Sequence, residues 1–365
     1  MRIAILGSVV TQVPPLGQAA IEWMAYHQAM GLAKRGHKVL LFAPEGSKVE
    51  HENIELVTVG KGGTLTGTGK EGDVGQTKRL GSSFKLRLEM THLGILIGEL
   101  LDRDSHFDIL LNNLRGEAMI VPVAEILRKP LVGVMHLPLF DELAALLKRY
   151  KTNLISISDA QRKAYPDLNY AATIYNGVDP EAFAYNETPD DYYLYLGSIG
   201  PNKNPRDALL ACKRAGVKMI LGGRIKDKIY YDKEIASHID GEIIKWVGEM
   251  HPGDVIELYR GAKAFLFPTM WEEPFGLVMI EAMSCGTPVV GYPHGAVAEV
   301  IEEGKNGFLV ENVEEMAGKI REMEEMENAA MRQLRMSARK SVEEKFTIEK
   351  MVRNYEEVLR KILPI

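Results

Sequence analysis

The chain has 365 residues, of which 46% are hydrophobic and 26% charged, and its formal net charge is −6. This composition is that of a folded globular protein, and the length suffices for two domains of ordinary size. The acidic balance argues against a nucleic-acid partner, and no apolar run approaches the length of a membrane span.

The cysteines and histidines give no sign of a disulfide or a metal site. Cys212 and Cys285 lie far apart, each in an apolar helical context, which favours two buried small residues and a reducing, cytoplasmic location. Neither the cysteines nor the nine histidines show metal-ligand spacing, so no metal is predicted. The apolar run at residues 3–7 is too short for a signal peptide and predicts a strand.

Short apolar runs alternate with helical patterns along the first half. A helix is predicted over 19–34, and strands are predicted over 3–7, 37–44, 109–112, 131–135, 154–157 and 172–174. Residues 60–83 are rich in Gly, Thr and Lys and predict a long loop. Such a loop is either a lid or acceptor-side loop, or an unstructured insertion.

The same alternation resumes in the second half, after a polar segment at 182–191 that we interpret as an interdomain hinge. Strands are predicted over 192–196, 217–221, 243–247, 264–267 and 288–290, and a charged helical region over 313–363 with a break near 346–347. The fold class is therefore α/β, with two doubly wound, Rossmann-like domains facing each other across a cleft. In such sheets ligands bind beyond the carboxyl ends of the strands.

The most informative segment is 271–286, W-E-E-P-F-G-L-V-M-I-E-A-M-S-C-G, in which Glu273 and Glu281 bracket seven residues. Gly276 stands where a helix should begin, so Glu273 lies just ahead of unpaired backbone N–H groups that also suit a phosphorylated ligand. Glu281 is placed to accept hydrogen bonds from sugar hydroxyls. In the alternative, Glu273 is only a helix-start carboxylate and Glu281 a solvated residue. The apolar surroundings of Glu281 favour a buried or half-buried charge, and hence a nucleotide-sugar site.

Glycines and cations follow the predicted strands of the second half. Gly200 and Lys203 follow 192–196, and Lys203 near a helix start suits a phosphate, with a surface lysine in a plain turn as the alternative. Arg224, after the next strand, is a candidate second cation or a surface arginine. The backbone at Val247 is a candidate to lie along a nucleobase.

His136 closes the strand predicted over 131–135 and is the candidate in the first half, with a satisfied structural histidine as the alternative.

With these residues assembled, segment 273–281 resembles the Glu-x7-Glu motif of family 4 glycosyltransferases, which are retaining enzymes with the two-domain glycosyltransferase B fold. The similarity continues through 282–290, 299–301 and 306–310 and is densest between residues 192 and 311. It implies an acceptor-side domain at 1–180, a nucleotide-sugar domain at 181–347, and a final helix at 348–365 that packs back on the first domain.

The resemblance also implies roles for the candidates. Glu281 would bind the donor ribose, Glu273 would face the transferred sugar, and Lys203 would stabilise the departing diphosphate. His136 matches the histidine that the family places near donor sugar and acceptor. The remaining donor-binding candidates are the amides of Phe275, Gly276 and Leu277, together with Ser198, Gly200, Arg224 and Val247.

The chain departs from the family pattern in two segments. Ser198 stands where the family usually has arginine, so one cation is missing unless Arg224 replaces it. In the loop that follows Gly17, Ala19 and Ala20 stand where paired glycines are expected, and alanine restricts left-handed conformations. We expect these changes to alter donor choice or weaken turnover.

The predicted reaction is transfer of a hexose from a nucleoside-diphosphate sugar to a hydroxyl acceptor with retention of configuration. It requires no cofactor; the donor is a UDP-sugar first and a GDP-sugar second. The acceptor (a sugar, a small molecule or a lipid) and the oligomeric state stay open. A sugar-nucleotide epimerase of the same fold and a degenerate sugar-nucleotide-binding protein without turnover are the alternatives. A dehydrogenase is disfavoured, because residues 7–12 lack the Gly-x-Gly-x-x-Gly turn.

Overall fold

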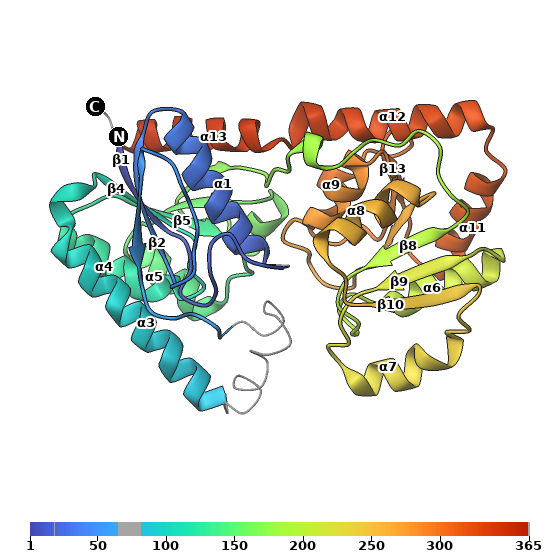
Figure 1. Cartoon of the computed structure of the whole chain (residues 1–365), viewed down its shortest axis with the longest axis horizontal. Helices are drawn as coiled ribbons and strands as arrows, with labels where there is room; N and C mark the ends of the chain where they lie inside the picture. Colours follow the sequence, from blue (N-terminus) through green and yellow to red (C-terminus); the bar gives the residue numbers. More distant parts are fainter. Residues whose placement is uncertain (18, 65–81, 364–365) are drawn as a thin grey trace. The chain divides into compact units, whose positions relative to one another are not determined.

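The computed structural model describes residues 1–17, 19–64 and 82–363 (Figure 1). The chain divides into two compact units. Unit 1 comprises Met1–Tyr175 and Ile348–Ile365, and unit 2 comprises Asn176–Thr347. The boundary between them therefore precedes the polar segment 182–191 that the sequence predicts as a hinge. Most of the predicted loop at 60–83 lies outside the described residues.

Unit 1 is built on a seven-stranded parallel sheet in the order β3-β2-β1-β4-β5-β6-β7. Its strands are β1 (Arg2–Leu6), β2 (Lys38–Ala43), β3 (Ile54–Thr58), β4 (Ile109–Asn112), β5 (Leu131–Met135), β6 (Asn153–Ser156) and β7 (Tyr170–Thr173). Its helices are α1 (Ala20–Lys34), α3 (Ser82–Asp102), α4 (Ile120–Leu127), α5 (Asp141–Arg149) and α13 (Ile348–Ile362). Short 3₁₀ turns lie at Asp104–His106, Glu117–Met119 and Ala160–Arg162.

The central strands of this sheet are more deeply buried than its edge strand β3. Every residue of β4 and β5 is buried, and all but Asn112 and Gly133 are apolar, as is typical of strands in a parallel sheet that is covered on both faces. In the edge strand β3, which the sequence analysis did not predict, only Val57 is buried and Glu55 and Thr58 are exposed. A strand half open to solvent carries a weaker apolar signal than a central one.

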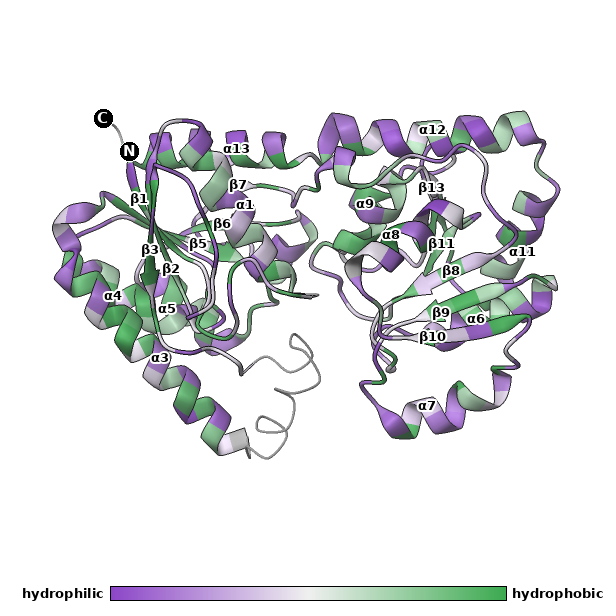
Figure 2. Ribbon diagram, viewed as in Figure 1, coloured by the Kyte–Doolittle hydropathy of each residue, from purple (hydrophilic) through white to green (hydrophobic). Residues whose placement is uncertain are grey.

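The last helix, α13, belongs to unit 1 and packs against α1 (Figure 1). Its buried residues recur at helical spacing, and hydrophobic and hydrophilic residues alternate along it in Figure 2. Gly31 in α1 permits the close approach, because a Cβ there would lie 2.4 Å from Val352 Cγ2. Glu356 accepts hydrogen bonds from Arg35 and from His37 Nε2, the latter at 2.9 Å. These contacts join the final helix to the beginning of the chain.

Unit 2 is built on a six-stranded parallel sheet in the order β10-β9-β8-β11-β12-β13. Its strands are β8 (Tyr193–Leu196), β9 (Met219–Gly222), β10 (Ile244–Gly248), β11 (Phe265–Phe267), β12 (Val289–Gly291) and β13 (Gly307–Leu309). Its helices are α6 (Pro205–Ala215), α7 (Lys228–Glu234), α8 (Pro252–Gly261), α9 (Leu277–Ser284), α10 (Val297–Val300), α11 (Val313–Glu324) and α12 (Asn328–Lys345). The 3₁₀ turns Pro180–Ala182 and Ala236–His238 complete it.

Each sheet has one point at which the chain reverses its direction of winding. In unit 1 this switch point lies between β1 and β4, and in unit 2 it lies between β8 and β11. The loops that leave two such neighbouring strands diverge, and the crevice between them is where doubly wound sheets bind ligands. We therefore expect ligand sites at the loops after β1 and β4 in unit 1 and after β8 and β11 in unit 2.

Candidate functional site

The loops after β8 and β11 bring Lys203 and Glu273 together at the switch point of unit 2. Lys203 Nζ forms an ion pair with Glu273 Oε2, whose residue is 7% exposed. Trp271 Nε1 donates a hydrogen bond to the same oxygen at 2.9 Å, and its ring centroid lies 4.9 Å from Lys203 Nζ. A largely buried carboxylate is thus compensated by a cation and an indole N–H.

Backbone and hydroxyl contacts fix the two loops against each other. Met270 N donates to Asn202 O at 2.9 Å, and Thr269 Oγ1 donates to the same carbonyl at 3.3 Å. The buried Tyr195 hydroxyl donates toward the carbonyl oxygens of Ser198, at 3.2 Å, and Lys203, at 3.4 Å. The lysine and the glutamate are therefore held on a supported framework.

The backbone at Glu273 lies in close contact with the backbone at Gly295 and Ala296. Ala296 N donates to Glu273 O at 2.9 Å. Gly295, with φ +62°, lies so close that a Cβ at this position would be 2.3 Å from Glu273 N. Only glycine fits here, because both the conformation and the space exclude a side chain.

Helix α9 begins directly after this loop. Gly276 precedes the first helical residue, Leu277, with a left-handed φ of +83°. Phe275 is buried and packs edge-on against Phe346, with ring centroids 5.9 Å apart. The first N–H groups of a helix have no intrahelical partner and carry partial positive charge, so this end of α9 suits an anion.

Glu281, near the end of α9, is half-buried, as predicted. Its Oε2 accepts a hydrogen bond of 3.1 Å from the hydroxyl of Tyr259, a buried residue of α8. Burial raises the pKa of Glu281 to about 7, although the Tyr259 hydrogen bond opposes the rise. Near neutral pH this carboxyl therefore changes its charge with small changes in its surroundings.

Glycines tie together the ends of the three neighbouring strands β8, β9 and β10. Gly197 N donates to Gly222 O at 3.0 Å, and Gly223 N donates to Gly248 O at 2.7 Å. Gly223 has φ +132°, and a Cβ there would lie 1.9 Å from Gly197 O. The backbones of the β8 and β9 loops thus touch without intervening side chains.

The remaining donor-site candidates lie on these same loops. Gly200 is buried and Ser198 half-buried, whereas Arg224 and Val247 are exposed. The carbonyl of Arg224 accepts a hydrogen bond of 2.9 Å from Ile199 N, so the two loops are also linked here. Unit 2 therefore carries every predicted donor-binding residue, from Ser198 to Glu281.

His136 follows β5 in unit 1, and its Nε2 lies 2.8 Å from Oδ1 of the buried Asn113. Burial and the neighbouring Arg115 lower the pKa of His136 to about 3, so its ring is neutral near pH 7. Arg115 Nη1 in turn pairs with the buried Glu22 of α1 at 2.6 Å, and Ser8 Oγ donates to the same carboxylate oxygen at 3.0 Å. A polar cluster thus spans the β1/β4 switch point.

The alanines of the N-terminal loop do not suffer the conformational restriction expected of them. Ala19 precedes α1 with φ −146° and Ala20 is the first residue of the helix, so neither adopts a left-handed conformation. Alanine fits this backbone without strain. Gly17 O accepts a hydrogen bond of 3.2 Å from Trp23 Nε1.

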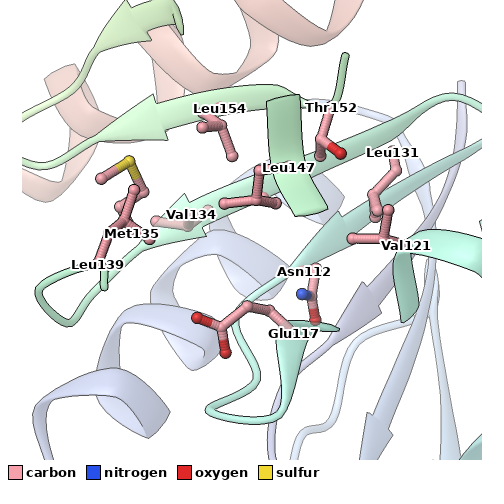
Figure 3. A pocket seen from close by; sticks show the side chains of 11 residues that line it. Asn112, Glu117, Val121, Leu131, Val134, Met135, Leu139, Leu147, Thr152 and Leu154 are labelled. Carbon is pink, nitrogen blue, oxygen red and sulfur yellow. The ribbon is translucent and has the colours of Figure 1, made fainter. Parts of the chain in front are cut away.

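A pocket in unit 1 lies along β4 and β5 (Figure 3). Its lining is mostly apolar, and its polar members are Asn112, Glu117 and Thr152. Burial raises the pKa of Glu117. A carboxyl group among aliphatic side chains is a poor receptor for a diphosphate, so this pocket does not compete with the unit 2 site.

Within residues 1–17, 19–64 and 82–363, no cluster of three or more histidine, cysteine, aspartate or glutamate residues is arranged to hold a metal ion. No helix in those ranges combines the length and the apolar character needed to span a bilayer. Cys212 and Cys285 are both free and buried.

Among the partners of the predicted residues that sequence reasoning did not find are Asn113, Arg115 and Tyr259. A signal existed for the first two, because N-N-L-R at 112–115 places polar residues at the carboxyl end of a buried strand. Tyr259 carries no such signal, since one tyrosine in an amphipathic helix resembles any other.

A model of the family described as Glycosyl transferases group 1 matches residues 179–341, most of unit 2. An uncharacterized glycosyltransferase of Methanocaldococcus jannaschii is 30% identical over 200 residues, which are 53% of this chain and 54% of the relative. The chain thus spans about half the length of that relative.

Two solved structures share the fold over nearly the whole chain. HepE of Anabaena in complex with UDP and glucose has a TM-score of 0.71 at 20% identity, covering 99% of this chain and 100% of its own. Sucrose-phosphate synthase of Thermosynechococcus elongatus has a TM-score of 0.76 at 16% identity, covering 99% and 98%. The predicted glycosyltransferase B fold of two Rossmann-like domains is confirmed. The family match over residues 179–341 and the fold of the whole chain together support a group 1 glycosyltransferase.

Proposed function

We propose that the protein transfers a hexose from a UDP-sugar to a hydroxyl acceptor with retention of anomeric configuration. The observation that carries the proposal is the Lys203–Glu273 pair, which lies ahead of α9 at the switch point of unit 2. A cation and a helix N-terminus suit a diphosphate, and a carboxylate beside them suits sugar hydroxyls.

Donor binding rearranges this pair in the proposed mechanism. Lys203 turns from Glu273 to the diphosphate, which carries more negative charge than one carboxylate. Glu273 then becomes available to the hydroxyls of the transferred sugar. The free protein thus keeps the buried carboxylate compensated until the substrate arrives, and each charge retains a partner in both states.

The barrier to be lowered is the charge separation that accompanies cleavage of the bond between the anomeric carbon and the diphosphate oxygen. Lys203 and the amides of Phe275, Gly276 and Leu277 stabilise the charge on the departing diphosphate. The acceptor hydroxyl attacks from the leaving-group face and passes its proton to the diphosphate, so no protein nucleophile and no cofactor are needed. Glu281 binds the ribose, and His136, in unit 1, contacts a substrate hydroxyl.

UDP is the first choice of nucleotide, because HepE, which has the same fold, was solved with UDP and glucose. GDP is the second. Ser198 supplies no charge where the family usually has arginine, and we assign the second cation to the exposed Arg224. Unit 1 takes the acceptor side and unit 2 the donor side. The two free, buried cysteines fit a reducing cytoplasm.

A thermal-shift screen over UDP- and GDP-sugars, followed by assays of nucleotide release with hydroxyl acceptors, tests the proposal. Ligand at about a hundred times its dissociation constant stabilises by about 2.7 kcal/mol, a shift that is readily measured. Acceptor-dependent release of UDP supports the transferase. A new sugar-nucleotide epimer formed without acceptor would establish the epimerase instead, and binding without either product would establish a protein that has lost turnover.

A further inference from the structure

A line of buried amides leads from His136 into the interior of unit 1. Asn113, directly after β4, is 1% exposed, and its Oδ1 lies 2.8 Å from His136 Nε2. Asn113 Nδ2 donates a hydrogen bond of 2.8 Å to Oε1 of Gln28, a residue of α1 that is fully buried. Three side chains, from the loops after β5 and β4 and from α1, thus form one continuous chain of hydrogen bonds.

The direction of the hydrogen bond between Asn113 and Gln28 determines the direction of the one between Asn113 and His136. Because the amide nitrogen of Asn113 is engaged by Gln28, the atom that faces His136 is a carbonyl oxygen, which can only accept. His136 Nε2 must then carry the hydrogen. With a pKa of about 3, the ring is neutral near pH 7, so Nδ1 carries a lone pair.

Beyond Asn113, Gln28 lies near Tyr355 of α13. Burial raises the pKa of the Tyr355 hydroxyl, and the neighbouring Gln28 opposes that rise. Neither Gln28 Nε2 nor the Tyr355 hydroxyl has a hydrogen-bond partner of good geometry within the described ranges. Gln28 is therefore hydrogen-bonded to Asn113 and not to Tyr355.

We propose that Asn113 and Gln28 are positioning residues that hold His136 as the Nε2–H tautomer, so that Nδ1 accepts a hydrogen bond from a substrate hydroxyl. The acceptor role of Nδ1 rests on the proposed function, whereas the tautomer is a property of the free protein. Gln28 acts through Asn113 and makes no hydrogen bond to His136 itself.

The test is ¹⁵N NMR of the His136 imidazole in the full-length protein, combined with turnover of UDP-sugar. In the wild type we expect the Nε2–H tautomer. In Gln28→Met, which keeps the length of the side chain but removes its acceptor, we expect a mixture of tautomers and a drop of about two- to tenfold in kcat/KM. Tyr355→Phe is the packing control and should leave both readouts unchanged, with the fold of each variant checked by its thermal melt.

The Nδ1–H tautomer in the wild type would overturn the proposal, because it requires both amides to be reversed. An unchanged tautomer in folded Gln28→Met would also overturn it. The NMR readout needs no substrate, so failure of the proposed function is seen separately. If the Nε2–H tautomer is found but no UDP-sugar binds or reacts, the proposed function and the role of Nδ1 fail, while the positioning by Asn113 and Gln28 stands.

Discussion

Lys203 and Glu273 are ion-paired across the switch point of the unit 2 sheet, although 70 positions separate them along the chain. The strand order brings β8 beside β11, and each strand delivers one of the two charges in the loop that follows it. The pair therefore places opposite charges beside the loop that leads into α9, where we propose that the donor binds.

Removal of the lysine charge should lower kcat, and because it leaves the buried Glu273 with the Trp271 N–H as its remaining side-chain partner, the thermal melt of the variant is measured beside its activity. Lys203→Met is expected to lower kcat for UDP-sugar turnover about 100- to 1,000-fold, since one well-aimed group that stabilises the leaving-group charge contributes about 3–4 kcal/mol. Lys340→Met, on the exposed surface of α12, is the matched control and should leave kcat within about twofold. Equal kcat values for Lys203→Met and wild type would contradict the assignment.

The indole of Trp271 should matter through its N–H group. Trp271→Phe keeps an aromatic ring beside Lys203 but removes the donor that lies 2.9 Å from Glu273 Oε2. A hydrogen bond to a charged group contributes about 1.5–3 kcal/mol, so kcat should fall about tenfold or more while the dissociation constant of UDP stays near its wild-type value. Weakened UDP binding with normal kcat would show that Trp271 contacts the nucleotide instead.

Nucleotide binding should depend on the ionisation of Glu281. Its pKa of about 7 in the free protein should fall when ribose hydroxyls donate to the carboxylate. Binding then releases a proton below pH 7, so affinity for UDP rises with pH up to about 7, by at most tenfold per pH unit, and is level above it.

Titration calorimetry across pH 5.5 to 8.5 (roughly one and a half units either side of the pKa) checks this. Glu281→Gln removes the titrating group and serves as the control for the ionisation of UDP itself. Tyr259→Phe removes a hydrogen bond that lowers the Glu281 pKa, and should move the rise in affinity to higher pH. Identical pH profiles for wild type and Glu281→Gln would refute the ribose assignment.

The contact between the β8 and β9 loops should tolerate no side chain. In Gly223→Ala the new Cβ meets Gly197 O at 1.9 Å and the backbone has φ +132°, so unit 2 should lose roughly 2–5 kcal/mol of stability. Gly241→Ala, also at positive φ but in open space, isolates the conformational cost and should lose about 1 kcal/mol. Denaturant unfolding of both variants gives the comparison; equal losses would mean that the loops separate freely.

The central strands of the fold follow directly from the sequence, and its edges do not. The bounds predicted for β4 and β5 agree with the structure because both strands are fully buried and mostly apolar. Edge strand β3, with Glu55 and Thr58 exposed, has no such run. The break between α11 and α12 at 325–327 was not predicted either, since the sequence Glu-Met-Glu contains no glycine or proline.

The candidate site shows the same contrast between features that a local sequence pattern predicts and features that depend on the fold. Glu273 and Lys203 each belong to a local motif at a strand end, which sequence reasoning can find. Their pairing, and those of Glu281 with Tyr259 and His136 with Asn113, depend on which strands and helices are neighbours. A single sequence carries no local signal for such long-range partners, so the candidate residues could be picked out from the sequence but their supporting contacts could not.

The most direct test of the central claim is a crystal structure of the protein with a bound UDP-sugar. We expect the diphosphate at the first turn of α9, against the amides of Gly276 and Leu277, with Lys203 Nζ within hydrogen-bonding distance and no longer paired with Glu273. A diphosphate bound elsewhere, or an empty site at saturating ligand with the Lys203–Glu273 pair intact, would contradict the account.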